Sequence, residues 1–325
     1  MKNWNTRINM TKAILTGLIS GLILLSCESK PSAEQSSHDY VSEAKKLNLL
    51  LNQGNVPPQR FEVGTTGTSE ITGAKGINLR VDPNDLETES GKPLGNKIQI
   101  ELRELTQPYE YIFSDVTGTS FGGKQILFGG TYWIAMTSDG QKLRIRPGRA
   151  LKINFRRFSS KRQEMFTGNR DSVQNVAWVN ANQRFKRISW EGSLEDHEYY
   201  QTMPVNRLGW ITSGVTNRAS QQTSTRLTYT ISDPGAYAFG KAHLIIEKEG
   251  TIQALTQTLF FNSRDNFTFE QVPLNGSGLF VVTAIKDGKL FAHVSRLNLE
   301  INEVPTVSLK QTSPGELYQK ILKLK

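Results

Sequence analysis

Apolar and polar residues alternate with a period of two from Phe61 to Phe155, which is the pattern of β-strands with one buried face. The segments GINLRV (76–81) and KIQIEL (97–102) carry an apolar residue at every second position. The segment 131–148 predicts two strands joined across Ser138-Asp139-Gly140. Short strands with turn signals and no intervening helices predict an antiparallel β-sandwich domain over residues 60–160.

The same alternation returns from Arg226 to Leu309, after a less regular stretch that contains Trp178, Trp190 and Trp210. Aromatic residues in such strands are usually core residues. The turn 286–289, Lys-Asp-Gly-Lys between two apolar runs, predicts a hairpin. Residues 161–310 are therefore predicted to form a second β-rich domain, and a further division near residue 225 is left open.

Helical spacing of apolar residues occurs only near the two ends of the chain. The segment 40–51, YVSEAKKLNLLL, predicts a short amphipathic helix that ends at the glycine and prolines of NQGNVPP. In the segment 311–325, Ser313 as N-cap, Pro314 and Glu316 predict a capping box, with Leu317, Ile321 and Leu324 buried. The predicted fold class is mainly β, with tandem antiparallel β-sandwich domains, a short N-terminal helix and a C-terminal helix.

The first 26 residues have the proportions of a signal peptide. Three cationic residues precede the apolar stretch 13–25, which is shorter than the about 20 residues that span a bilayer. The stretch ends in Leu24-Leu25-Ser26-Cys27, which resembles the bacterial lipobox. In that class of signals the cysteine receives the lipid and becomes the first mature residue. Residues 27–59 are then a lipidated, flexible tether followed by the short helix. The alternative is an ordinary signal peptide with an incidental cysteine.

The cysteine content and the charge restrict where the protein is expected to lie and which partners it is expected to bind. Cys27 is the only cysteine, so the chain forms no internal disulfide and has no Cys-based metal site. From Cys27 onward the chain carries 36 Lys and Arg against 30 Asp and Glu. We expect a lipid-anchored protein of the cell envelope, at the outer membrane. An envelope protein or an anionic polysaccharide is the expected partner, and nucleic acid is not.

The segment GTSFGGKQ, 118–125, has the glycine and lysine spacing of a phosphate-binding loop. Gln125 replaces the serine or threonine that would bind magnesium, and the following residues read as a strand, where the motif needs a helix. We therefore expect no nucleotide binding, and we interpret the glycines as turns and bulges.

Candidate catalytic residues are few. The four histidines are far apart, and Asp196-His197-Glu198 is the only one flanked by carboxylates. A zinc or hydrolase site there would need further ligands from elsewhere. We therefore assign no catalytic residue, metal ligand or cofactor. A pair of carboxylates that cleaves glycosides has no characteristic spacing in the sequence, because its two members need only meet in the folded protein.

Basic residues are dense from Lys142 to Arg170, where only Glu164 opposes them. On alternating strands these side chains would face outward and form a surface for phosphate, uronate or lipid headgroups. The alternative is a solvated face that acidic residues from other segments neutralise. The candidate residues are Lys142, Arg144, Arg146, Arg149, Lys152 and Arg156.

Several longer segments resemble a family of Bacteroidota envelope lipoproteins for which no activity is established. They are 76–86, 91–105, 118–155, VNRLGWI (205–211) and VSLKQTSPGELYQKILKL (307–324). The first β-block is also similar, more distantly, to the protein-binding β-sandwich of ankyrins, zonula occludens proteins and netrin receptors. Members of the bacterial family commonly carry Cys-Asp after Gly-Trp-Ile, where this chain has Thr212-Ser213. Asp171-Ser172-Val173 resembles the O-glycosylation sequon of exported Bacteroidota proteins, which makes Ser172 a candidate modification site.

These observations predict a membrane-anchored, non-enzymatic protein that presents a β-sandwich surface to an envelope protein or an anionic glycan. The alternative is a hydrolase of envelope polymers that uses carboxylates without a recognisable pattern. A deep pocket with converging carboxylates would favour the hydrolase.

Overall fold

The computed structural model describes residues 33–120, 123–185, 203–216, 224–261, 266–273, 276–299 and 305–324. Strands make up 56% of the structure and helices 14%, and the sheets are antiparallel with few exceptions. A helix lies near each end of the described chain. The predicted fold class is confirmed.

A large sheet of 13 strands forms the centre of the described structure. Nine of its strands follow one another in the order β10 (Val176–Arg184), β9 (Glu164–Arg170), β12 (Gly209–Thr216), β6 (Ile126–Ser138), β15 (Thr251–Leu259), β14 (Phe239–Lys248), β17 (Ser277–Lys286), β18 (Lys289–Asn298) and β20 (Lys310–Gln311). Four more extend it beside β6, namely β1 (Gln59–Gly64), β4 (Leu86–Thr88), β5 (Lys97–Leu105) and β7 (Gln141–Ile145).

Two smaller sheets and the helices complete the structure. The four-stranded sheet has the order β11 (Met203–Val205), β8 (Leu151–Asn154), β3 (Asn78–Val81) and β2 (Ser69–Thr72), and the three-stranded sheet has the order β16 (Asn266–Pro273), β13 (Ser224–Ile231) and β19 (Thr306–Val307). The helices are α1 (Ala33–Gln53), α2 (Pro108–Phe113) and α3 (Pro314–Leu322), and single 3-10 turns are η1 (Pro83–Asp85) and η4 (Pro234–Ala236).

Alternation along the strands of the large sheet separates three hydrophobic cores. On β14, Phe239 and Ile245 face a core that α1, α2 and α3 cover, whereas Ala242 and Leu244 face the three-stranded sheet. On β6, Phe128 belongs to the helix-covered core. Further along the strand, Tyr132, Ile134 and Met136 face the four-stranded sheet. The helices therefore cover one face of the large sheet, and the two small sheets cover opposite ends of the other face.

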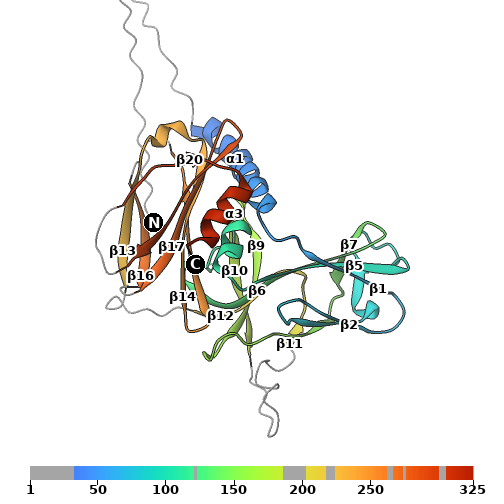
Figure 1. Cartoon of the computed structure of the whole chain (residues 1–325). Helices are drawn as coiled ribbons and strands as arrows, with labels where there is room; N and C mark the ends of the chain where they lie inside the picture. Colours follow the sequence, from blue (N-terminus) through green and yellow to red (C-terminus); the bar gives the residue numbers. More distant parts are fainter. Residues whose placement is uncertain are drawn as a thin grey trace, which may run out of the picture.

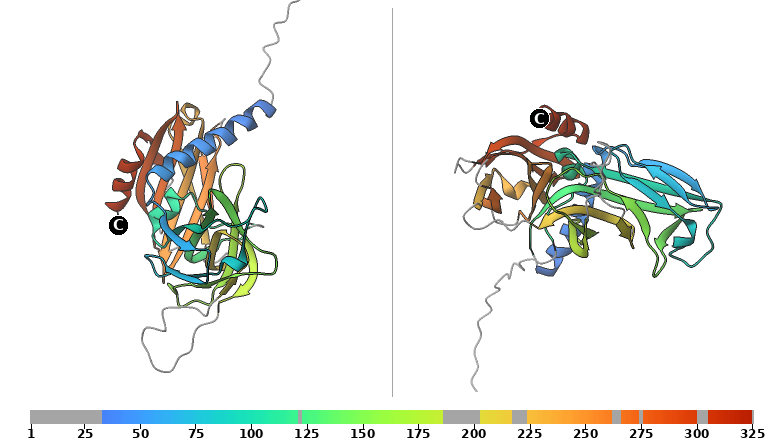
Figure 2. Two further views of the ribbon diagram at one scale, coloured as in Figure 1. Left: turned by 90° about the vertical axis from the view of Figure 1, so that its right-hand side faces the viewer. Right: turned by 90° about the horizontal axis from the view of Figure 1, so that it is seen from below.

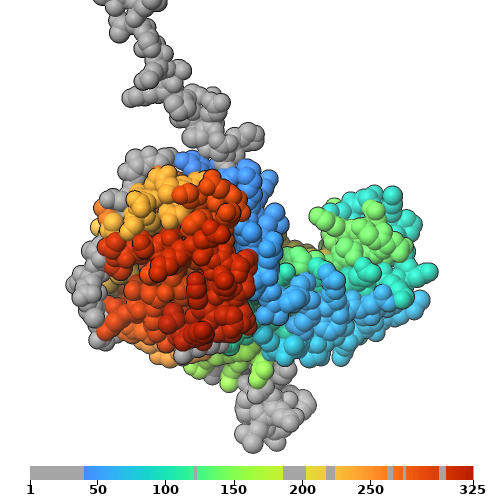
Figure 3. Space-filling model, turned by 45° about the horizontal axis from the view of Figure 1, so that its top comes forward, coloured from blue at the N-terminus to red at the C-terminus, as the bar shows by residue number. Residues whose placement is uncertain are grey.

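The molecule has two lobes because the small sheets lie far apart. In Figure 1, β13 and β16 lie at one end of the large sheet, and β1, β2, β5 and β7 project from the other end. Figure 3 shows the lobe with β1, β2, β5 and β7 standing apart from the lobe with β13 and β16. The surface is hollowed between the tip of the former lobe and α1. In Figure 2 the first turns of α1 extend beyond the sheet that its later turns cover.

The predicted turns and caps are present at the predicted residues. Asp139 and Gly140, and likewise Asp287 and Gly288, have positive φ angles between paired strands, as two-residue hairpin turns require. Ser313 and Glu316 form the predicted capping box of α3.

Burial and helix limits agree with the pattern, with differences at Leu324 and at the start of α1. Leu317 and Ile321 are buried, and so are Trp178 and Trp210. Leu324, which was also predicted to be buried, is only partly buried, and Trp190 lies outside the described residues. Helix α1 begins at Ala33, so it includes seven residues that the sequence predicted as flexible tether. The composition of that stretch is polar, and composition alone does not distinguish a tether from the start of a helix.

The predicted boundary between two β-domains lies inside a continuous hydrogen-bonded sheet. Strand β6, from the predicted first domain, pairs with β12 and with β15, which come from the predicted second domain. The chain therefore builds two sandwiches that share one large sheet, and the division near residue 160 stays a prediction.

Candidate functional site

The six predicted basic residues lie on two different sheets. Lys142 and Arg144 project outward from β7, at the edge of the large sheet. Arg144 is 2.8 Å from Glu87 on β4, and Arg149 is 3.9 Å from Asp85. Arg146 donates a hydrogen bond to the carbonyl oxygen of Leu86, at 2.9 Å. Acidic neighbours from the segment 85–87 thus balance part of this group.

Lys152 and Arg156 are separated from that group by a hydrophobic core. Lys152 is exposed on β8, in the four-stranded sheet, while its neighbours Leu151 and Ile153 are fully buried. Arg156 follows β8, and its guanidinium lies 5.7 Å from the centre of the Phe158 ring. The structure therefore brings Lys142, Arg144, Arg146 and Arg149 together, and it places Lys152 and Arg156 on another layer.

A further cation, which was not among the six predicted residues, lies beside Lys152. Arg80 on β3 lies directly opposite Lys152 in the strand ladder, and both side chains are exposed. Within the described residues neither cation forms an ion pair, although Glu70 on β2 lies opposite Arg80 on its other side. Like charges at directly opposed positions destabilise a sheet. An anion held between Arg80 and Lys152 would remove this repulsion.

A row of amides continues the same surface. The Asn78 side chain donates a hydrogen bond to the hydroxyl of Thr72 at 3.1 Å, and the Asn154 side chain donates one to Oδ1 of Asn78 at 3.4 Å. These residues occupy the next outward positions of β2, β3 and β8. The outer face of the four-stranded sheet thus offers two adjacent cations beside hydrogen-bonding groups on rigid strands.

A groove of about 570 Å³ lies on the outer face of β1, β5 and β6, and its charged lining residues, Arg60, Glu62 and Glu101, form ion pairs. Arg60 pairs with Glu101 at 3.1 Å, and Lys97 pairs with Glu62 at 2.5 Å. Exposed pairs of this kind are worth about 0–1 kcal/mol each. This groove has no excess charge of either sign among these four side chains.

The segment 118–125 leads into a strand, as the sequence predicted. Lys124 and Gln125 are followed directly by β6. No helix N-terminus follows the glycines, so the arrangement that cradles phosphate in a phosphate-binding loop is not formed by these described residues. Residues 121–122 lie outside the described part of the chain.

Strand β6 has a bulge at Gly129-Gly130, and the bulge borders a cavity. The ladder between β6 and β12 shifts register so that Ser213 faces Gly130 while Gly214 faces Phe128. On its other edge, β6 pairs with β5 at residues 131–137 and with β15 at Leu127 and Phe128. Among the described residues, Gly129 and Gly130 therefore have no strand partner on that edge, and we call this gap the slot.

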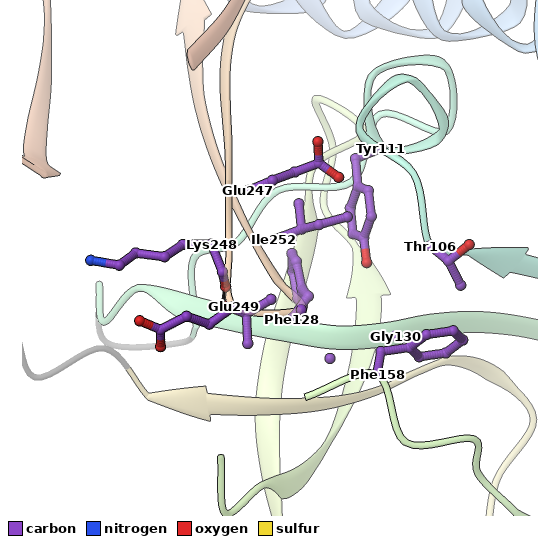
Figure 4. Close-up of a pocket in the computed structure, with 12 residues that line it drawn as sticks. Thr106, Tyr111, Phe128, Gly130, Phe158, Glu247, Lys248, Glu249 and Ile252 are labelled. Atoms are coloured by element: carbon purple, nitrogen blue, oxygen red, sulfur yellow. Dashed lines mark hydrogen bonds between the residues drawn. The ribbon is translucent and has the colours of Figure 1, made fainter. Parts of the chain in front are cut away.

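The cavity at the slot encloses about 260 Å³ (Figure 4). Tyr111, Phe128, Ile252 and Phe158 supply its apolar lining, and the β14–β15 turn supplies Glu247 and Glu249. In Figure 4 the carboxylate of Glu247 lies near Tyr111, whereas that of Glu249 points to the opposite side of the turn. The two carboxylates do not converge on one point.

Buried hydroxyl groups lie beside the slot. The Tyr111 hydroxyl donates to the carbonyl oxygen of Leu105 at 3.1 Å and lies 3.2 Å from the Thr131 hydroxyl. Thr131 contacts the Thr212 hydroxyl at 2.9 Å, and Thr212 donates to the Gly130 carbonyl oxygen at 2.8 Å. Burial raises the pKa of Tyr111. Thr212 and Ser213 are both fully buried in this wall.

A buried charged cluster lies under the helices, and sequence analysis did not find it. Lys241 on β14 and Asp115 after α2 form an ion pair with exposed fractions of 0% and 1%. Asn48 of α1 donates to the same Asp115 carboxylate oxygen at 3.3 Å. Lys241 sits in the buried part of β14, residues 239–246, where His243 is the only other residue with a titratable side chain, and its contact with Asp115 accounts for a charge at this position. The cluster ties α1 and α2 to the large sheet.

The remaining predicted sites are Cys27, the Asp196-His197-Glu198 cluster and Ser172. Cys27 and the Asp196-His197-Glu198 cluster lie outside the described residues. Ser172 is exposed in the turn between β9 and β10, where the Asp171 carboxylate accepts hydrogen bonds from the amides of Val173 and Asn175. Among the described residues, no group of three or more His, Cys, Asp or Glu side chains could hold a metal ion, and no helix is long and apolar enough to cross a membrane.

Comparisons with known proteins add no relative. No protein-family model and no curated protein matches this chain.

Proposed function

We propose that this protein is a non-enzymatic lipoprotein of the cell envelope, held at the outer membrane through Cys27, and that it binds an anionic glycan. The observation that carries the proposal is the pair Arg80 and Lys152, two exposed cations on facing positions without a carboxylate partner among the described residues. Uronate or phosphate groups of a polysaccharide would neutralise this pair, and the amides of Asn78 and Asn154 would reach its hydroxyl groups. A flat, strand-borne surface suits an extended polymer.

The arrangement of acidic residues supports binding over hydrolysis. Glycoside hydrolysis by paired carboxylates needs two carboxyl groups on either side of the scissile bond, about 5–10 Å apart. Glu247 and Glu249 border the cavity at the slot, but their carboxylates point to different sides (Figure 4). Glu104 and Glu110, which are buried, accept hydrogen bonds from backbone amides and hold local structure.

Replacing both cations of the pair is expected to weaken binding of an acidic glycan by at least tenfold. Charged hydrogen bonds contribute about 1.5–3 kcal/mol each, and 1.4 kcal/mol is tenfold in affinity. The measurement is isothermal titration of an oligomer of galacturonic acid into the purified protein and into the Arg80→Gln/Lys152→Gln variant. The wild-type affinity is expected to fall as salt is added.

The matched control is the Arg144→Gln/Arg149→Gln variant, which removes the same charge from the group next to Glu87 and Asp85. It is expected to bind within about twofold of wild type, because those cations already have acidic neighbours. Equal losses in the two double variants would show a non-specific charge effect and would contradict the proposed site.

The anchor is tested separately. Replacing Cys27 with serine removes the only thiol that could carry a lipid, so the variant is expected to lose all incorporation of labelled palmitate and to leave the membrane fraction. The measurement is metabolic labelling followed by membrane fractionation in a bacterium with the lipoprotein pathway. Labelled or membrane-bound Cys27→Ser protein would refute the lipobox assignment.

A further inference from the structure

We infer that the slot at Gly129-Gly130 is a second binding site, for a ligand that carries a primary ammonium group on an apolar body. The site differs from the glycan surface in position and in charge. It lies where β6 changes partner from β5 to β15, and acidic side chains border it. The inference does not depend on the proposed function.

The interior of the slot is built for an apolar group. Tyr111, Phe128 and Ile252 are buried in the helix-covered core and present their inner surfaces to the cavity. Phe158 closes the opposite side (Figure 4). Burying apolar surface contributes about 25 cal/mol per Å², so a ring or branched chain that fills this space gains affinity without a specific polar contact.

Three glycines give the slot its shape. A Cβ atom on Gly129 would lie 2.0 Å from the buried side-chain amide of Gln163, and one on Gly250 would lie 1.9 Å from the Phe158 carbonyl oxygen. Gly130 has a φ angle of 144°, which side chains with a Cβ rarely adopt. The chain segment that bears Phe158 and Gln163 can approach β6 and the β14–β15 turn this closely only because these positions lack side chains.

The edge of β6 at the slot is not covered by a described strand. Among the described residues, neither β5 nor β15 pairs with Gly129 or Gly130, although the Gly130 carbonyl oxygen already accepts a hydrogen bond from the Thr212 hydroxyl. An unpaired edge presents carbonyl oxygens and N–H groups in the directions of a strand ladder. An ammonium group has three donors, so it can donate to such a carbonyl oxygen and to a carboxylate together.

Glu247 supplies the complementary charge. Its backbone pairs with Ile252, it lines the cavity, and its carboxylate points toward Tyr111 (Figure 4). No described cation forms an ion pair with Glu247. Glu249, on the next outward position, already pairs with Lys161 at 3.2 Å. The ammonium of Lys248 points away from the cavity in Figure 4. Glu247 is therefore the carboxylate that a ligand cation would meet.

The test uses two amines and one acid of similar size on the purified protein. Phenethylamine represents a free amine, phenylalanyl-glycinamide represents a peptide amino terminus, and phenylacetate carries the opposite charge. Binding is followed by chemical-shift changes of backbone amides. We expect saturable changes at Gly129, Gly130 and Ile252 with at least one amine, and binding of phenylacetate at least tenfold weaker. A response to phenethylamine alone identifies a free amine as the ligand class, and a response to the dipeptide alone identifies a peptide amino terminus.

Two variants tie the response to the slot. Glu247→Gln keeps the size of the side chain and is expected to weaken amine binding at least tenfold, whereas Glu249→Gln, the matched control, is expected to leave it within twofold. Thr106→Trp places an indole at the wall of the cavity and is expected to abolish binding. No saturable response to either amine, equal binding of phenylacetate, or an unchanged response in Glu247→Gln would each overturn the inference. None of these results bears on Arg80 and Lys152.

Discussion

Replacing Asp115 with asparagine is expected to lower the free energy of unfolding by about 3–5 kcal/mol. Asp115 and Lys241 form a fully buried ion pair, and removing one partner leaves a buried charge without compensation. Burial lowers the pKa of Lys241, and the charge of Asp115 opposes that shift. Asparagine keeps the shape of the side chain and tolerates the positive φ of 50° found at this position. Urea unfolding at pH 7 measures the loss.

A double-mutant cycle separates the ion pair from packing. Lys241→Met also leaves an unpaired buried charge, on Asp115, and is expected to cost a similar amount. The Asp115→Asn/Lys241→Met protein has no buried charge at this point, so its loss is expected to be smaller than the sum of the single losses by at least about 2 kcal/mol. Additive losses would show that the two side chains act independently and would contradict the role given to the pair.

Acid is expected to destabilise the protein below about pH 6.5 through His243. Burial lowers the pKa of His243 to about 4, against about 6.5 in the unfolded chain. Between these values the unfolded state binds more protons, so stability falls as the pH falls. The contribution is fully present above the unfolded pKa and is lost as the pH decreases toward 4, by about 3 kcal/mol in total, at about 1.4 kcal/mol per pKa unit. Unfolding curves from pH 7.5 to 4 measure it.

The His243→Gln variant lacks the titrating imidazole and is expected to lose most of this pH dependence. The Nδ1 atom of His243 lies 3.2 Å from the Thr256 hydroxyl, and the glutamine amide offers a group for that contact. His293 is the matched control, because burial also lowers its pKa but it is only half-buried. An unchanged slope in His243→Gln, or a larger change in His293→Gln, would assign the acid sensitivity elsewhere.

The fold class was predictable because local rules act along most of the chain. Period-two alternation placed the strands around Leu79 and Ile100, and turn chemistry placed the hairpins at Asp139-Gly140 and Asp287-Gly288. The capping box at Ser313 was readable because all of its partners lie within four residues. The shared sheet was not predictable, because the pairing of β6 with β15 joins residues more than 120 positions apart, and no local pattern specifies such a pairing.

The candidate sites depended on those distant pairings. An outward position for Arg80 follows from the alternation in GINLRV, but its place opposite Lys152 depends on the register between β3 and β8. The basic stretch reads as one cluster in the sequence, yet a core separates Lys142 from Lys152 once β7 and β8 join different sheets. The partner of Lys241 lies 126 residues away. In each case the sequence shows the charged residue, but it does not show which residue lies next to it in the folded protein.

The most direct test of glycan binding is to map where an acidic oligomer touches the protein. Amide chemical shifts of the purified full-length protein are recorded as an oligomer of galacturonic acid is added. The account predicts saturable changes concentrated on β3 and β8, at residues 78–81 and 151–154, with small changes on β7. Changes concentrated at Lys142 to Arg149, or none that saturate, would contradict the claim that Arg80 and Lys152 form the binding surface.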